Sequence, residues 1–196
     1  MSIQARKERD RAQREKLIIT AARELAEAEG WDAVTTRRLA ERVEYSQPVL
    51  YSHFKGKDAI TTAVALEGFA DMAAELRAAR TAAGDPADAL ARLSAAYVAF
   101  ADQRPALYDA MFSRKVNLPF ATPQTPAALR AAFDEFVEAV SPHAHDTDAA
   151  LLAETFWAAL HGLAMLMRDG RIPREHHDLR LALLLASFTH RPASPT

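Results

Sequence analysis

Apolar residues recur three or four positions apart along most of the chain, and no run of alternating or β-branched residues suggests a strand. This spacing places the apolar side chains on one face of an α-helix. It predicts an all-α protein of about nine helices. A chain of 196 residues, 49% of them hydrophobic, can bury a substantial core in such a fold.

Helix start and stop signals predict the individual helices and a domain boundary near residue 57. Gly30 provides a stop for the first long helix, and Thr35 precedes a short one. Asp85 followed by Pro86 marks another start, because aspartate caps helices and proline suits their first turn. Helices are predicted over about 10–28, 36–43, 46–54, 58–79, 86–102, 127–140, 147–168 and 175–189, with a shorter one from Pro105 and a loop over 114–126.

The stretch Ser46–Phe54, SQPVLYSHF, carries a proline where a helix is expected. Backbone N–H groups in the first turn of a helix need no internal partner, so Pro48 marks a helix start. Ser46 can cap this helix through the Val49 N–H; alternatively, the helix begins one residue later because Gln47 precedes a proline. With the preceding short helix, either start makes a helix-turn-helix.

In this motif, over about 36–54, Leu50 and Phe54 share a face that can pack on Leu39 and Val43. The opposite face lies at the N-terminal end of the second helix, the part that reaches base edges in DNA-reading motifs. The residues placed to contact bases or phosphates are Gln47, Pro48, Val49, Tyr51, Ser52, His53, Lys57, Thr35 and Thr36. The alternative interpretation is that the rings belong to the core and that the proline only starts a helix.

The run VTTRRLAERVEYSQPVLYSHFKGKDAI, residues 34–60, resembles the TetR/AcrR (tetracycline-repressor-like) family of bacterial transcription regulators. Family members show a threonine cap, an arginine, a Leu/Ile-Ala pair, a serine cap, a Leu-Tyr pair, an aromatic-rich end and a Lys-[Asp/Glu] start to the next helix. Those places are filled by Thr35, Arg37, Leu39-Ala40, Ser46, Leu50-Tyr51, Phe54 and Lys57-Asp58. With the preceding helix, the resemblance covers about a quarter of the chain.

This resemblance implies a DNA-binding domain over 1–57 and a helical effector-binding and dimerisation domain over 58–196. It implies phosphate contacts from Thr36, Tyr51, His53 and Lys57, and base-facing positions for Gln47, Pro48, Val49 and Ser52. Thr35, Arg37 and Ser46 complete the predicted DNA-binding set. The chain departs from the family pattern at Glu44, where glycine is usual because it adopts a positive φ at little energetic cost. It also departs at His53, a position that is often tyrosine.

A second resemblance lies in FWAALHG, residues 156–162, which is similar to the Trp-His-Gly signature of one C-terminal subclass of this family. Trp157 and His161 are four residues apart and so share a helix face. The helices over about 147–168 and 175–189 are apolar around most of their circumference, which predicts cover by a second subunit. In the family the last two helices commonly form a four-helix dimer interface, so a homodimer is expected.

The central and C-terminal helices supply rings and thioethers that could line an apolar pocket, and few charges lie among them. We therefore expect a mostly apolar small-molecule effector; the alternative is that these side chains are simply core. The candidate ligand-binding residues are Phe69, Met72, Tyr97, Phe100, Met111, Phe112, Trp157 and His161.

No HExxH, GxSxG, GxGxxG or GxxxxGK motif is present, so neither enzymatic activity nor a cofactor is expected. Two histidine-rich stretches lack a third ligand at useful spacing, so no metal is expected. The absence of cysteine and of a signal peptide is consistent with the cytoplasm. Residues 149–167 could span a bilayer by length, but Glu154 and His161 lie within them, and a buried soluble helix is predicted.

The net charge of −2 is distributed unevenly. Residues 1–60 carry 12 Lys/Arg against 10 Asp/Glu, and the remainder carries 12 against 16, so the N-terminal end is the one that suits an anionic partner. The sequence thus predicts a dimeric repressor that reads a palindromic DNA operator and is released by a small effector. An activator of the same fold and a helical small-molecule-binding protein remain alternatives.

Overall fold

A computed structural model describes residues 2–114, 116 and 118–189, and within them every regular element is helical. The α-helices are α1 (Ile3–Glu29), α2 (Thr36–Arg42), α3 (Gln47–His53), α4 (Lys57–Thr81), α5 (Pro86–Gln103), α6 (Pro105–Phe112), α7 (Ala127–Val140), α8 (Ala149–Arg168) and α9 (His177–Thr189). Three short 3₁₀ helices, η1 (Trp31–Ala33), η2 (Ser141–His143) and η3 (Arg174–His176), connect them. The all-α prediction is confirmed.

The chain forms two compact units, each built from two segments of the sequence. The first unit comprises Met1–Gly68 and Arg104–Pro126, and the second comprises Phe69–Gln103 and Ala127–Thr196. Helix α4 crosses the boundary, and α6 returns to the first unit. These units do not coincide with the predicted division at residue 57, which separates the chain by function and stays a prediction.

Helix α1 begins earlier than expected. The spacing of apolar residues predicts a start near residue 10, but the helix starts at Ile3, where the Ser2 hydroxyl caps it by accepting a hydrogen bond from the Ala5 N–H at 3.2 Å. Its buried residues begin only at Ile18, so the first four turns carry no apolar stripe from which the start could be predicted. Gly30 ends the helix with φ +82°, as predicted.

Helix α6 is held against α1 within the first unit. Because Pro105 lacks an N–H, the first free backbone donors of α6 are those of Ala106 and Leu107, and both bond to the Glu27 carboxylate at 3.1 and 2.9 Å. The Trp31 indole N–H donates to the Ala106 carbonyl at 2.8 Å. A carboxylate at a helix N-terminus is electrostatically favourable, so Glu27 fixes α6 by charge as well as by hydrogen bonds.

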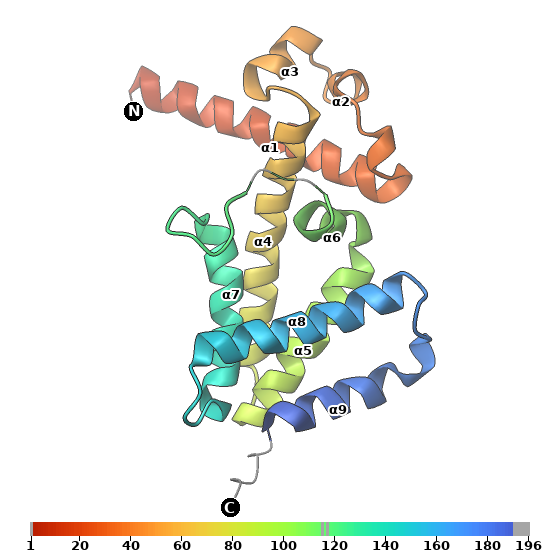
Figure 1. Ribbon diagram of the computed structural model, residues 1–196. Coiled ribbons are helices and arrows are strands. Elements are labelled where there is room, and N and C mark those ends of the chain that lie inside the picture. Colours follow the sequence, from red (N-terminus) through yellow and green to blue (C-terminus); the bar gives the residue numbers. More distant parts are fainter. Residues whose placement is uncertain (1, 115, 117, 190–196) are drawn as a thin grey trace, which may run out of the picture. The chain divides into compact units, whose positions relative to one another are not determined.

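In the second unit, α8 packs on α5 and α7 (Figure 1). Ring contacts fill this core, including Tyr97 with Phe136 at 5.5 Å between centroids and Phe156 with Phe188 at 5.0 Å. Glu135 of α7 has only 2% of its surface exposed, and Arg77 and Arg80 of α4 both bond to it. The second half of α4 is thereby fixed to α7 by a buried charge with two partners.

Helices α8 and α9 each keep an apolar face outside the core of the second unit. Helix α8 buries one stripe that includes Phe156 and Leu160, but Leu151 and Leu166 are exposed. Helix α9 has no buried residue, and Leu179 and Leu183 are each 62% exposed. Helix α8 also has the length and composition of a membrane span, which is weak evidence by itself because helices of soluble proteins pass the same test.

Candidate functional site

Helices α2 and α3 pack on each other through a small apolar contact. Each helix has seven residues, and Leu39 and Leu50 are both fully buried. Leu50 is the one buried residue of α3, so it decides which face of that helix turns inward. The helix-turn-helix expected from residues 36–54 is therefore present, and its second helix is anchored by the predicted leucine.

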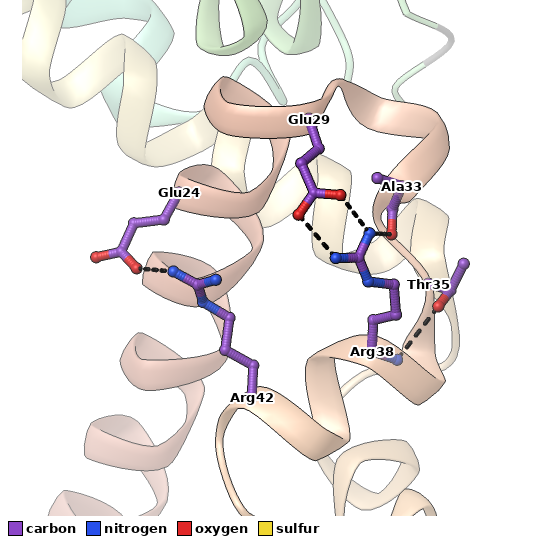
Figure 2. A network of polar contacts seen from close by, with 6 residues as sticks. All are labelled: Glu24, Glu29, Ala33, Thr35, Arg38 and Arg42. Carbon is purple, nitrogen blue, oxygen red and sulfur yellow. Dashed lines mark hydrogen bonds and ion pairs between the residues drawn. The ribbon is translucent and has the colours of Figure 1, made fainter.

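Two arginines connect α2 to α1 (Figure 2). The Arg38 guanidinium donates to both oxygens of Glu29, at 2.8 and 2.7 Å, and Arg42 donates to Glu24 at 2.9 Å. The bond from Arg38 holds the pKa of the Glu29 carboxyl below its usual value. These pairs are exposed and add little to stability, but the two-pronged arginine contact sets the orientation of α2.

The turn between α2 and α3 contains a residue in the left-handed region. Glu44 has φ +56°, and the next N–H, that of Tyr45, bonds back to the Ala40 carbonyl at 2.9 Å. The positive φ expected at this position is therefore present in a residue with a side chain, which costs free energy relative to glycine.

Helix α3 starts at Gln47, within the predicted interval, with Ser46 at the cap position. The Ser46 hydroxyl makes no capping hydrogen bond, so the alternative in which it accepts from the Val49 N–H is wrong. Pro48 removes one of the two N–H groups that a cap normally reaches, which leaves the hydroxyl a single backbone partner. Thr35, in contrast, caps α2 by accepting from the Arg38 N–H at 3.2 Å.

The outer face of α3 carries five of the eleven predicted DNA-binding residues. Val49 and Tyr51 are 37% and 51% exposed, and the Ser52 hydroxyl donates to the Val49 carbonyl at 2.6 Å. The Tyr51 hydroxyl lies 3.4 Å from the Thr36 hydroxyl, so side chains from both helices meet on this surface. The predicted residues that are exposed are Thr35, Arg37, Ser46, Gln47, Pro48, Val49, Tyr51 and Ser52.

The side chains of two residues predicted to contact phosphates, His53 and Lys57, are directed into the first unit. The His53 side chain is 6% exposed, and its Nδ1 lies 3.4 Å from Glu15 of α1. The Lys57 ammonium donates to the Trp31 carbonyl at 2.5 Å. It also borders a polar hollow that the sequence does not reveal, lined by Lys57, Asp58, Thr61, Asp109, Ser113 and Arg114.

An α2 that is anchored through Leu39 and an α3 that presents its outer face define a helix-turn-helix protein of the DNA-binding class. Residues 18–64 match the family model for bacterial regulatory proteins of the tetR family, and residues 90–188 match that for the tetracyclin repressor-like C-terminal domain. The chain belongs to this family of transcriptional regulators.

Known relatives agree with this family. The chain is 31% identical over 155 residues to the HTH-type transcriptional regulator Rv0681 of Mycobacterium tuberculosis, covering 78% of this chain and 69% of that protein. It is 50% identical over 56 residues to the class C tetracycline repressor protein of Escherichia coli, covering 29% of this chain and 25% of that protein. A solved structure of a protein of unknown function from Rhodococcus sp. RHA1 superposes with a TM-score of 0.75 at 26% identity, covering 89% of this chain and 93% of that one.

The candidate ligand-binding residues are divided between the two units. Met111 and Phe112 lie in the first unit, and the other six lie in the second. Three of those six form a chain of hydrogen bonds: the Trp157 indole N–H donates to the Tyr97 hydroxyl at 3.0 Å, and that hydroxyl lies 3.0 Å from His161 Nδ1. Phe69, Met72, Phe100 and Met111 are buried.

The indole N–H can only donate, so the Tyr97 hydroxyl accepts from Trp157. A hydroxyl can accept a second hydrogen bond, so the contact between Tyr97 and His161 Nδ1 is compatible with either tautomer of the neutral imidazole. Burial, followed by the nearby charge of Arg168, lowers the pKa of His161.

Replacing Glu44 by glycine is expected to stabilise the protein. The left-handed conformation costs a residue with a side chain about 1–2 kcal/mol, which glycine avoids. The greater conformational freedom of glycine in the unfolded chain offsets about 0.5–1 kcal/mol of this stabilisation. We expect Glu44→Gly to raise the free energy of unfolding by up to about 1 kcal/mol in urea titrations. The matched variant Glu41→Gly, inside α2, should lower it by about 1 kcal/mol. Equal destabilisation by both would mean that Glu44 is unstrained.

His161 should make the stability depend on pH. Because its pKa in the folded state lies below its ordinary value of 6.5, the unfolded chain binds the proton more readily. The free energy of unfolding should therefore fall as the pH drops below about 6.5. His161→Gln should reduce this loss between pH 7 and 5, measured by thermal unfolding, whereas His176→Gln on exposed η3 should not. An unchanged profile for His161→Gln would contradict the assignment.

Proposed function

We propose that the protein is a dimeric repressor that reads a palindromic DNA operator with α3 and is released by a small, mostly apolar effector. The observation that carries this proposal is the outer face of α3: its polar and small apolar side chains are exposed while Leu50 alone is buried. Family membership supports transcriptional regulation. Repression, the operator and effector release are our proposals.

Within the DNA interface, we assign base contacts to the start of α3. Gln47 can form two hydrogen bonds with adenine, and Pro48 and Val49 offer apolar contacts for a thymine methyl group. Tyr51 and Thr36, whose hydroxyls are 3.4 Å apart, suit a shared phosphate. Lys57 would reach a phosphate only by releasing the Trp31 carbonyl, so we assign it a positioning role in the free protein.

We propose that α8 and α9 of two copies cover each other. Their exposed apolar residues, Leu151, Leu166, Leu179 and Leu183, lie on the last two long helices. Lipid is a poor cover for α8, because Glu154 and Thr155 are exposed on the helix near Leu151. A two-fold dimer would place two α3 helices on half-sites about 34 Å apart, or a multiple of that distance. The cytoplasm is the compartment that this function requires.

For the effector, we favour the second unit, around Trp157, Tyr97 and His161. The hydrogen-bond chain fixes the imidazole orientation, and aromatic residues surround it. The same helix carries the stretch that is similar to the Trp-His-Gly subclass, and we propose membership of that subclass. Release requires an effector that binds more tightly to a dimer whose α3 helices are wrongly spaced for the operator. Helix α4 is the proposed route because it contributes to both units.

Selecting bound fragments from random DNA with the purified protein tests this proposal most directly. We expect a palindromic site of two half-sites. Gln47→Ala should lose about 1–3 kcal/mol of discrimination at one base pair in each half-site, whereas Tyr51→Phe should weaken binding to all sequences alike. Gln124→Ala, in an exposed loop, is the matched control. Unchanged base preference in Gln47→Ala would show that Gln47 does not make the base contact assigned to it.

Leu183→Glu should convert the dimer to monomers. A two-fold interface contains Leu183 twice, so losing about 1.5–3 kcal/mol of burial per side weakens association by about 10²–10⁴-fold. Sedimentation velocity at micromolar concentration measures this change. Leu17→Glu, which alters a 49% exposed leucine of α1, is the control and should remain dimeric. A dimeric Leu183→Glu protein would place the interface elsewhere.

A further inference from the structure

The N-terminal part of α1 lies outside the core of the first unit. None of residues 2–17 is buried, although the helix is continuous and capped at Ser2. A helix of this kind has little intrinsic stability in water, and it persists because it extends a packed helix whose nucleation is already complete. We call residues 3–16 the α1 extension. At about 1.5 Å per residue, it is roughly 20 Å long.

The face of α1 that packs on the core continues into the extension as a basic stripe. The buried residues Ile18, Ala21 and Leu25 lie three or four positions apart. Continuing this spacing from Ile18 towards the N-terminus leads to Arg14, Arg11 and Lys7, which therefore lie on the same face. The positions that meet the core further along the helix thus change from apolar to cationic at Arg14, where the core ends.

The charges of this stripe are only partly balanced within the protein. Residues 1–16 contain six Lys/Arg and three Asp/Glu in a chain whose net charge is −2. Arg11 is paired with Glu15 at 2.9 Å, and Glu8 accepts from Gln4 at 3.0 Å. Lys7 and Arg14 form no ion pair with any residue that the structure describes.

The extension starts next to α3. Glu15 lies at its base and contacts His53, the last residue of α3, at 3.4 Å. Figure 1 shows α1 continuing past this end of α3 towards the N-terminus within the first unit. A DNA duplex read by α3 would therefore continue beside the extension, and phosphates outside the half-site would face a basic helix. An anionic membrane is a poorer partner, because the extension has one large apolar residue, Ile3, and no apolar face.

We propose that Lys7 and Arg14 bind DNA phosphates that flank the half-site read by α3. This inference rests on the proposed function, since it requires α3 to hold the duplex in place. Contacts of this kind add affinity without adding base preference, because phosphates carry no direct sequence information. The extension would thus lengthen the DNA footprint of each protomer and make binding more dependent on salt.

The salt dependence of operator binding tests the proposal in the full chain, using the site selected from random DNA. Each phosphate contact contributes about 0.9 to the slope of log K against log salt. The double variant Lys7→Ala, Arg14→Ala should therefore lower the slope by about 1.8 per protomer and leave base preference unchanged. The matched control is Arg9→Ala, Lys16→Ala, which removes two charges at the same spacing from the opposite face and should retain the slope.

Alanine favours helix at all four positions, so neither variant should disturb the fold, and circular dichroism checks this. Equal slope changes in both double variants would overturn the proposal, because they would report net charge rather than this face. Binding to phosphatidylglycerol vesicles that depends on Lys7 and Arg14, with an unchanged DNA slope, would overturn it as well. Failure of the wild-type protein to select any DNA site would instead refute the proposed function.

Discussion

Burial of a single side chain, Leu50, determines how the helix-turn-helix is presented. Helix α3 has two turns and one buried residue, so the contact of Leu50 with the core that holds Leu39 sets the rotation of the helix about its own axis. Everything opposite Leu50 is then exposed by geometry alone. The two arginine pairs between α2 and α1 contribute to the same presentation, because they orient α2, the helix on which α3 packs.

The first unit combines the reading motif with a helix from the middle of the chain. Glu27 and Trp31, at the end of α1 and just beyond it, bond to the first residues of α6. A displacement of α6 would therefore act on α1, the helix to which Arg38 and Arg42 of α2 bind through Glu29 and Glu24. Within the first unit, the helix-turn-helix is thus connected to α6 through the Glu27 carboxylate and the Trp31 indole, in addition to its connection to α4 along the chain.

Local signals in the sequence predict most of the helices, whereas side-chain directions that depend on partners distant in the sequence could not be predicted. Thr35, Pro48, Asp85 and Gly30 act within a few residues of themselves, so the boundaries that they mark are found where expected. The inward directions of His53 and Lys57 depend on Glu15 and Trp31, 38 and 26 residues away, and no local pattern contains that information. Periodicity also fails at Ile3, because the first turns of α1 bury nothing.

Helix α9 has a thermodynamic consequence beyond its role as a proposed interface. Its residues are at most half-buried within their own protomer, where Phe188 packs on Phe156, so cover by a second subunit would add to its stability. In the proposed dimer, the part of its stability that comes from the second subunit would depend on protein concentration by mass action. On dilution the backbone amides of α9 would exchange with solvent before those of α5 or α7, and the C-terminal segment would respond to the abundance of the protein in the cell.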